Sequence, residues 1–254
     1  MEHNQGNPEP VKGKEWAPGQ SLRLIFNDIL IGTLEQYFKM KKHELPEEFA
    51  HKKLEQEGGL IEQISSLYTF EKVQAVRLGA FNAEGAVYVR NATIWPADDY
   101  DFPVLIYDSA ETKRWLFILV DIHPLRRDEN YLKRYTEPLA VINAKYKDIP
   151  RVKGSRTELR KWAQPYSSGY PLYFRCPKEF EGKVEQGFKD YLDFYVDKIK
   201  EAMPIEDERR RTELLEFKQE FKTVYAENDP GGGPYRTFFG EEWTERFLSE
   251  FLFS

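Results

Sequence analysis

Apolar and polar residues alternate along much of the first half of the chain, with the two-residue period that is typical of β-strands. Five such runs follow one another with short turns between them. We expect strands at residues 60–68, 72–81, 86–95, 102–108 and 114–123. Because so few residues separate consecutive strands, each strand should pair with the next in the opposite direction, and the pattern predicts an antiparallel meander.

On either side of this run, apolar residues recur at the spacing of α-helices. Ser21 is a typical helix cap, and apolar residues follow it at helical spacing as far as Leu34. After Pro124 we expect helix through residue 147 and then one more strand at 170–175. Further helices are expected at 178–202, at 206–225 and, after a Gly-Pro loop at 229–234, from residue 241 onward.

Helices before, within and after a run of antiparallel strands can cover both of its faces. The pattern therefore predicts the α/β class, as a three-layer α/β/α sandwich with a central, mainly antiparallel sheet. The chain has 254 residues and no internal repeat, so we expect one domain over residues 21–254. Residues 1–20, rich in proline, glycine and charge, should form a flexible N-terminal segment.

Few residues that could hold a redox centre are present. Cys176 is the only cysteine, which excludes an intrachain disulfide, a cysteine-ligated iron–sulfur cluster and a CxxC site. The four histidines lack metal-ligand spacing, and His123 is interpreted as a strand-end residue rather than a catalytic one. The chain also lacks a glycine-rich nucleotide loop. We expect no metal and no bound cofactor, with electrons supplied from outside.

Charge and hydropathy limit the binding partners and cellular compartments expected for the protein. The net charge of −6 and the lack of a recognised motif argue against binding to nucleic acid. No apolar stretch reaches membrane length, and the N-terminal residues lack the apolar core of a signal peptide. We expect a soluble, cytoplasmic protein.

Asp108 is the residue that most needs an explanation. It closes the apolar run 102–107, so its carboxyl group should lie at the end of a buried strand, where an unpaired charge is costly. Such a site favours the protonated acid, which can donate a proton near neutral pH. The alternative is a structural role, with the carboxylate capping a turn together with Ser109.

Three segments in the same order resemble the ferredoxin-dependent bilin reductases, which reduce the open-chain tetrapyrrole biliverdin. The first is Asn91 followed by the Trp95-Pro96 pair and then Asp108. The second is YPLYFRCP at 170–177, and the third is the tail at 227–253, with its Asn-Asp pair, Phe-Gly and terminal Trp-bearing helix. The resemblance covers roughly residues 60–253. It implies the same sandwich fold, with biliverdin IXα held between the sheet and the C-terminal helices.

The resemblance also implies roles for particular residues. Asp108 matches the central aspartate that protonates the bilin and binds its pyrrole nitrogens. Asn91 stands where members that form phycocyanobilin carry a histidine, and it would orient the ligand or water without titrating. Asp229 matches a C-terminal aspartate that in some members protonates the A-ring end of the bilin, although a plain turn-forming role before Pro230 stays open.

Biliverdin carries two propionates, so its pocket needs cations. Arg175, in the second matching segment, is the expected propionate clamp. Relatives carry a basic residue just after the C-terminal aspartate, where this chain has only proline and glycine. Arg236 is a substitute candidate for that second contact, and Asn228 is a further candidate for substrate binding.

The product is expected to be 15,16-dihydrobiliverdin. Gly79 aligns with a glutamate that serves reduction of the D-ring vinyl group in members that form phycocyanobilin, so that product is disfavoured. The segments around 123–139 and 167–176 resemble members that reduce the C15 methine bridge. Alternatives are a four-electron reduction to phycoerythrobilin or another phytobilin, a non-catalytic bilin carrier, and a reductase of a chlorophyll breakdown bilin.

Reduced ferredoxin is the electron donor that the resemblance implies, delivering single electrons without a bound redox cofactor. Ferredoxins are acidic, so we expect a transient contact through a basic patch on a monomeric protein. If the source is an alga, the compartment would be the plastid stroma. The candidate patches are Lys113-Arg114, Arg126-Arg127, Lys133-Arg134 and the run Arg151, Lys153, Arg156, Arg160 and Lys161.

Overall fold

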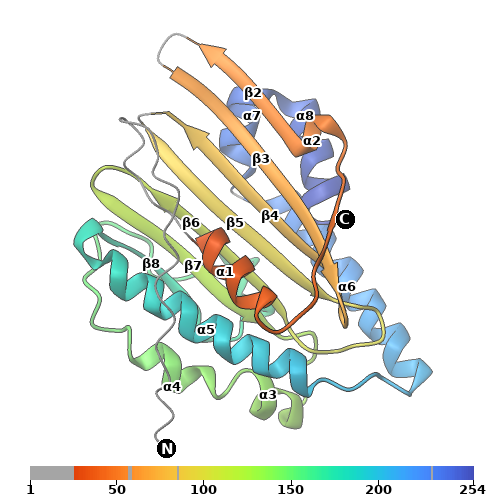
Figure 1. Ribbon diagram of the computed structural model, residues 1–254. Helices are drawn as coiled ribbons and strands as arrows, with labels where there is room; N and C mark the ends of the chain where they lie inside the picture. The colour runs from red at the N-terminus through yellow and green to blue at the C-terminus, as the bar shows by residue number, and fades with distance from the viewer. Residues whose placement is uncertain (1–25, 57–58, 85, 230) are drawn as a thin grey trace, which may run out of the picture.

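An eight-stranded antiparallel sheet forms the centre of the computed structural model, which describes residues 26–56, 59–84, 86–229 and 231–254 (Figure 1). The strand order is β1-β3-β4-β5-β6-β7-β8, and β2 also pairs with β3. The strands are β1 (Lys41–His43), β2 (His51–Gln56), β3 (Gly59–Phe70), β4 (Val73–Ala83), β5 (Val87–Pro96), β6 (Val104–Glu111), β7 (Trp115–His123) and β8 (Leu172–Pro177). The meander expected from the sequence is confirmed as β3 to β7, and the later strand as β8.

Two strands were not predicted. Both β1 and β2 pair with β3 at the same edge of the sheet. The strand β1 is made of two lysines and a histidine, and in β2 Leu54 is the single apolar residue. Since an edge strand buries little, neither segment has the alternating pattern that reveals a strand.

Helices cover both faces of the sheet, which confirms the three-layer α/β/α sandwich (Figure 1). On one face lie α1 (Phe26–Glu35) and α5 (Glu181–Glu201), where Phe26 and Phe188 pack against Tyr107 of β6. On the other face lie α6 (Glu208–Asn228), α7 (Gly232–Phe239) and α8 (Glu241–Arg246), followed by the π-helical turn η3 (Phe247–Leu252).

The contacts of α6 fix it against the sheet. Phe221 meets the buried ring of Trp95 edge-on, with 5.3 Å between the ring centroids. Lys218 is buried nearby and donates to the carbonyl oxygens of Pro96 and Ala97, each at 3.0 Å. These contacts hold the second half of α6 over the middle strands, which is where the candidate site lies.

The segment expected to be helical from 124 to 147 contains two helices, α3 (Glu129–Tyr135) and α4 (Leu139–Ala144). The carboxylate of Asp128 caps α3 by accepting from the amide of Tyr131 at 3.1 Å. Pro138 explains the break, because a proline disfavours helical conformation in the residue before it. The short elements α2 (Glu47–Ala50), η1 (Gln164–Tyr166) and η2 (Lys178–Phe180) complete the described structure.

Other expected boundaries need adjustment. The loop prediction at 229–234 was wrong at its end, because α7 begins at Gly232 and contains Pro234 in its first turn. Proline is tolerated there, since the first amides of a helix have no intrahelical partner. Ser21 and the expected flexible segment 1–20 lie outside the described residues, and α1 begins at Phe26.

Candidate active site

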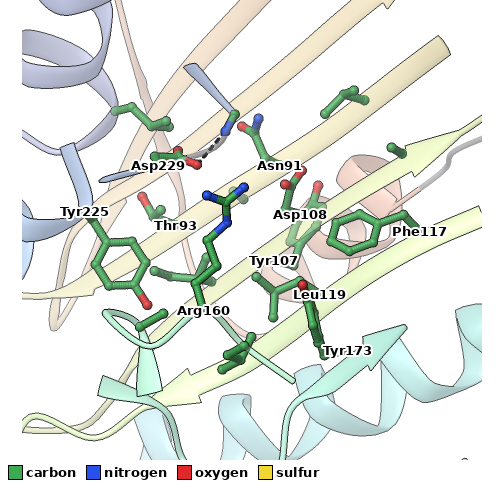
Figure 2. Close-up of a pocket in the computed structure, with 18 of the residues that line it drawn as sticks. Asn91, Thr93, Tyr107, Asp108, Phe117, Leu119, Arg160, Tyr173, Tyr225 and Asp229 are labelled. Carbon is green, nitrogen blue, oxygen red and sulfur yellow. Dashed lines mark hydrogen bonds between the residues drawn. The ribbon is translucent and has the colours of Figure 1, made fainter. Parts of the chain in front are cut away.

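A cavity of about 410 Å³ lies between the sheet and the C-terminal part of the chain. Its volume is in the range of small-molecule sites. The floor comes from the face of β4 to β8 that α6 and α7 cover, and Figure 2 shows many of its side chains. The cover comes from the connection after α4, the end of α6 and later residues: Arg156, Leu159, Arg160, Trp162, Ala163, Tyr225, Asp229, Gly231, Pro234, Tyr235, Leu252 and Phe253.

Strand register explains why the floor residues come together. Residues that are directly paired in neighbouring strands point to the same face of a sheet. One row of paired residues runs Gly79, Asn91, Asp108, Leu119 and Tyr173 from β4 to β8. The next row runs Phe81, Val89, Ala110, Phe117 and Arg175. Apart from Gly79, every member of both rows lines the cavity.

Asp108 has the environment that the sequence predicted for a proton donor. One of its carboxyl oxygens, Oδ1, is sealed from solvent and has no hydrogen-bond partner. Burial, reinforced by the charge of Asp229, raises the pKa of the Asp108 carboxyl to about 7, although the backbone amide of Ser109 opposes the rise. Near neutral pH this group can therefore give up a proton to a bound molecule.

Asn91 is directly paired with Asp108 and lies beside it in the cavity (Figure 2). Its Oδ1 is also buried without a partner. On its other side is Gly79, and a Cβ atom at that position would overlap Asn91 Oδ1. Asn91 thus fills the space that an acidic side chain at position 79 would need. Its amide adds hydrogen-bonding groups next to Asp108 without adding a titrating group.

Asp229 reaches the cavity from the opposite wall, directly after α6 (Figure 2). Its Oδ1 accepts from the amide of Gly231 at 2.8 Å, so the residue forms a turn and lines the site at the same time. Burial raises the pKa of the Asp229 carboxyl, while the Gly231 amide and the charges of Arg160 and Arg236 oppose the rise. The cavity therefore holds two carboxyl groups whose pKa values are raised above the ordinary value.

Arg175 lines the cavity on β8, as the sequence led us to expect. Its guanidinium lies over the ring of Trp115, with 4.2 Å from Cζ to the ring centroid, and its Nε is buried without a partner. A planar cation held against an aromatic ring is suited to binding a carboxylate through parallel hydrogen bonds.

The structure does not bring Asn228 and Arg236 into the cavity lining. Asn228 is exposed in the last turn of α6, where its Nδ2 donates to the carbonyl oxygen of Val224 at 2.9 Å. Arg236 lies on α7 and pairs with Glu241, with 2.7 Å from Nε to Oε1. Their substrate-binding roles stay predictions, and Arg236 acts on the cavity through its charge near Asp229.

Within the described ranges, no group of three or more His, Cys, Asp and Glu side chains could hold a metal ion. No helix among these residues is long and apolar enough to cross a membrane.

Comparison with known proteins decides the family. The family model for the ferredoxin-dependent bilin reductases matches residues 27–254. The chain belongs to this family. This bilin reductase is 33% identical to the 15,16-dihydrobiliverdin:ferredoxin oxidoreductase of Gloeobacter violaceus, over 73% of this chain and 76% of that protein. It is 30% identical to the phycoerythrobilin:ferredoxin oxidoreductase of Nostoc punctiforme, over 76% of each.

A solved structure agrees with the fold of this bilin reductase. The crystal structure of phytochromobilin synthase from tomato, in complex with biliverdin, superposes with a TM-score of 0.78. The match covers 90% of this chain and 81% of that chain, at 18% sequence identity. The family and the fold that the sequence motifs indicated are thus confirmed, and the chain is a ferredoxin-dependent oxidoreductase of bilins.

His123 is part of the reductase cavity although the sequence analysis assigned it no more than a place at a strand end. It is buried at the end of β7 and lines the site. Its Nδ1 lies 2.9 Å from the carbonyl oxygen of Tyr166, so Nδ1 carries the hydrogen, and Nε2 is buried without a partner. Burial lowers the pKa of the imidazole and favours the neutral ring.

The side chain of Asp121 explains how the segment after Trp162 is held near His123. Asp121 is buried, and its carboxylate accepts from the hydroxyls of Ser167 and Ser168 and from the amide of Ser168. These bonds satisfy a buried charge and anchor the residues that carry the Tyr166 carbonyl. No periodic signal marks this arrangement in the sequence.

Arg156, Arg160 and Tyr225 also line the cavity and were not recognised as site residues. The two arginines were visible only as members of the basic run at 151–161, and Tyr225 only as an apolar position near the end of a helix. The placement of the two arginines depends on the path of a connection that lacks both a helical and a strand pattern. A cluster of arginines before the strand that carries Arg175 was the one available signal.

Proposed function

We propose that this chain reduces biliverdin IXα at the C15 methine bridge to 15,16-dihydrobiliverdin, taking electrons one at a time from reduced ferredoxin. The observation that carries the proposal is the Asp108 carboxyl, whose pKa of about 7 makes it a usable acid in a cavity of suitable size. The name of the Gloeobacter violaceus relative, a 15,16-dihydrobiliverdin:ferredoxin oxidoreductase, supports the choice of reaction.

The reaction adds two electrons and two protons, and it leaves hydrogens on C15 and C16 of the tetrapyrrole. Two ferredoxin molecules, or one used twice, supply the electrons. We assign one proton to Asp108, which lies centrally on the floor of the cavity, and the other to solvent. Each proton neutralises charge that an added electron would otherwise place in a buried site, so electron and proton transfers should be coupled.

The expected site of reduction follows from the residues beside Asp108. Gly79 provides no acid there, and Asn91, which occupies the adjoining space, does not titrate. Without a second acid beside Asp108, the D-ring vinyl group should survive. Asp229 adds a second acid on the opposite wall, which favours phycoerythrobilin as the runner-up product.

Binding should depend on the propionates and on the rings of biliverdin. Arg175 is the proposed clamp for one propionate, with Trp115 fixing the plane of the guanidinium. Aromatic and aliphatic side chains make most of the remaining lining, as a flat conjugated ligand requires: Phe81, Val89, Ile106, Phe117, Leu119, Trp162, Tyr173, Tyr225, Leu252 and Phe253.

We place the ferredoxin contact on the basic run at 151–161, beside the cover of the cavity. Lys153, Arg156 and Lys161 are exposed and make no ion pair within the described residues. In contrast, Arg126 and Lys133 pair with neighbouring carboxylates, which reduces the positive field of those patches. An acidic partner at this site would stand close to the bilin. We expect the protein to act as a monomer without a bound redox cofactor, in the cytoplasm or the plastid stroma.

An anaerobic assay with biliverdin, ferredoxin and a reducing system tests the proposal, with the products separated by chromatography. The expected product has a shortened conjugated system and blue-shifted absorbance. Phycocyanobilin as the end product would overturn the argument from Gly79 and Asn91. Phycoerythrobilin would leave that argument standing and show that Asp229 is also a donor. Binding without turnover would support the carrier alternative, which does not require the two buried acids.

A further inference from the structure

His123 brings to the cavity a hydrogen-bonding atom that no residue of the described chain uses. The side chain lines the cavity at the end of β7 and is almost fully buried. Its Nε2 is sealed from solvent and has no hydrogen-bond partner among the described residues. A buried polar atom without a partner is costly, so such an atom in the wall of a pocket is a candidate contact for a ligand.

The other ring nitrogen determines what Nε2 of His123 can do. Nδ1 lies 2.9 Å from the carbonyl oxygen of Tyr166, which can only accept, so Nδ1 is the donor. Burial lowers the pKa of the imidazole and favours the neutral ring, although the charge of Asp121 opposes this shift. A neutral imidazole with its hydrogen on Nδ1 leaves Nε2 as an acceptor. The ligand group that satisfies Nε2 must therefore be a hydrogen-bond donor.

Packing fixes the imidazole of His123 in this orientation. The rings of Phe221 and Tyr225 both meet it edge-on, with 5.4 and 5.6 Å between the ring centroids. Tyr166, which supplies the carbonyl, is itself held by its hydroxyl, which donates to Glu220 Oε1 at 2.8 Å. Because the acceptor is held in place before a ligand arrives, little entropy is lost when the ligand binds.

His123 stands well away from Asp108 along the floor of the cavity. Asp108 is paired with Leu119, and His123 follows Leu119 by four residues on β7. A rise of about 3.3 Å per residue places the two positions about 13 Å apart along the strand. A tetrapyrrole whose inner nitrogens lie at Asp108 would therefore reach His123 with a terminal ring. The terminal rings of biliverdin are lactams, and each lactam nitrogen carries a hydrogen that Nε2 can accept.

We propose that Nε2 of His123 accepts a hydrogen bond from the lactam N–H of one terminal ring of the bilin. This inference rests on the proposed function and deepens it, because it adds a contact at the end of the ligand to those of Asp108 and Arg175. His123 transfers no proton in this role. It fixes how far the tetrapyrrole extends beyond Asp108, and thereby which bridge carbon lies at the acid.

Ligands that differ at the lactam test this contact without ferredoxin. The full chain is titrated with biliverdin IXα and with its two mono-O-methyl lactim ethers, in which one or the other terminal ring nitrogen has lost its hydrogen, and the absorbance is followed. His123→Phe keeps an aromatic ring and removes the acceptor, so binding of biliverdin should weaken roughly tenfold. With one of the two ethers, the native chain and His123→Phe should bind within about twofold of each other, which also identifies the ring.

Two further measurements distinguish this contact from a purely structural role. His123→Gln again offers an acceptor and should recover part of the affinity for biliverdin. In a chain labelled with nitrogen-15 at histidine, the Nε2 signal of His123 is assigned by its loss in His123→Phe. Addition of biliverdin should shift this signal in the direction expected for a nitrogen that accepts a hydrogen bond, and an unchanged signal would contradict the proposal.

His43→Phe is the matched control, because it makes the same substitution on β1, outside the lining of the cavity. It should leave all three affinities unchanged. Equal weakening of biliverdin and both ethers by His123→Phe would show a structural role and overturn the contact. If the native chain did not bind biliverdin, the proposed function itself would fail, which is a distinct result. Circular dichroism and thermal unfolding of each variant verify that it is folded.

Discussion

Asn91 occupies the space that a side chain on Gly79 would need. The two residues face each other across β4 and β5, and a Cβ atom on Gly79 would stand 3.1 Å from Asn91 Cγ and overlap its Oδ1. The identities of these two positions are therefore coupled by packing. An acid introduced at position 79 would have to displace Asn91 from its place beside Asp108.

This contact predicts a cost for the smallest possible substitution. Gly79→Ala should destabilise the protein by about 1–3 kcal/mol, as overpacking does, and much of that loss should be recovered in the double variant Gly79→Ala/Asn91→Ala. Denaturant unfolding of the two single variants and the double variant measures the coupling. Additive effects would show that the two side chains do not compete for space.

Gly182→Ala is the matched control for that measurement. Gly182 lies in α5, and a Cβ atom there would have no heavy atom within 4 Å. Alanine is also the better helix former, so this substitution should be neutral or slightly stabilising. A loss of stability as large as that of Gly79→Ala would remove packing as the explanation.

Asp108→Asn should separate binding from turnover. Asparagine keeps the shape and the hydrogen-bonding capacity of the side chain but cannot supply the proton, so we expect turnover to fall roughly 100-fold or more while the Kd for biliverdin changes little. Single-turnover rates and absorbance titration give the two quantities. A variant that turns over at the native rate would show that Asp108 serves only the structure.

The pKa of Asp108 also predicts how stability changes with pH. The carboxyl has an ordinary pKa of 3.8 and a folded-state pKa of about 7, so the folded protein holds a proton that the unfolded chain releases between these values. The stability from this proton is complete below about pH 4 and is lost as pH rises through about 7. Asp108→Asn should therefore have a higher Tm than the native protein at pH 8, by about 2–4 °C for each kcal/mol, and little difference near pH 4. Equal Tm differences at both pH values would contradict this.

The ferredoxin contact should be sensitive to salt. Attraction between an acidic partner and the run at 151–161 is screened by ions, so turnover at limiting ferredoxin should fall roughly tenfold between about 0.05 and 0.5 M salt. Lys153→Gln/Lys161→Gln should lower the rate at low salt and reduce its salt dependence. Lys133→Gln is the control, because Lys133 is already paired with Glu129 at 2.6 Å. A flat salt response would point to another donor or another surface.

Sequence patterns revealed the sheet because its strands differ in burial between faces. In β4 to β7 one or both faces of the strand are buried, so the buried positions must be apolar. The resulting alternation or continuous apolar run identified all four strands. In β1 and β2 nothing is buried that would impose such a pattern. The break at Pro138 was missed because apolar spacing continues through it, although the proline itself was a sufficient signal.

The part of the site that lies on the strands could be predicted from the sequence. Asp108 ends an apolar run, and the register that places Asn91 beside it follows from a tight antiparallel meander. Arg160 and His123 depend instead on the path of a long connection and on contacts between residues far apart in sequence, such as the Tyr166 carbonyl with His123. Local periodicity contains no information about such contacts, so sequence reasoning placed neither residue in the cavity.

The two walls of the cavity are made at different times. The floor comes from residues 81–175, whereas part of the cover comes from Asp229, Tyr235 and Phe253, which are synthesised after the floor. A nascent chain can thus build the sheet and its helices α1 and α5 while the acid of the floor still faces water. Asp229 contributes to the raised pKa of the Asp108 carboxyl, so we expect this pKa to reach its full value of about 7 only after the later segment has packed over the floor.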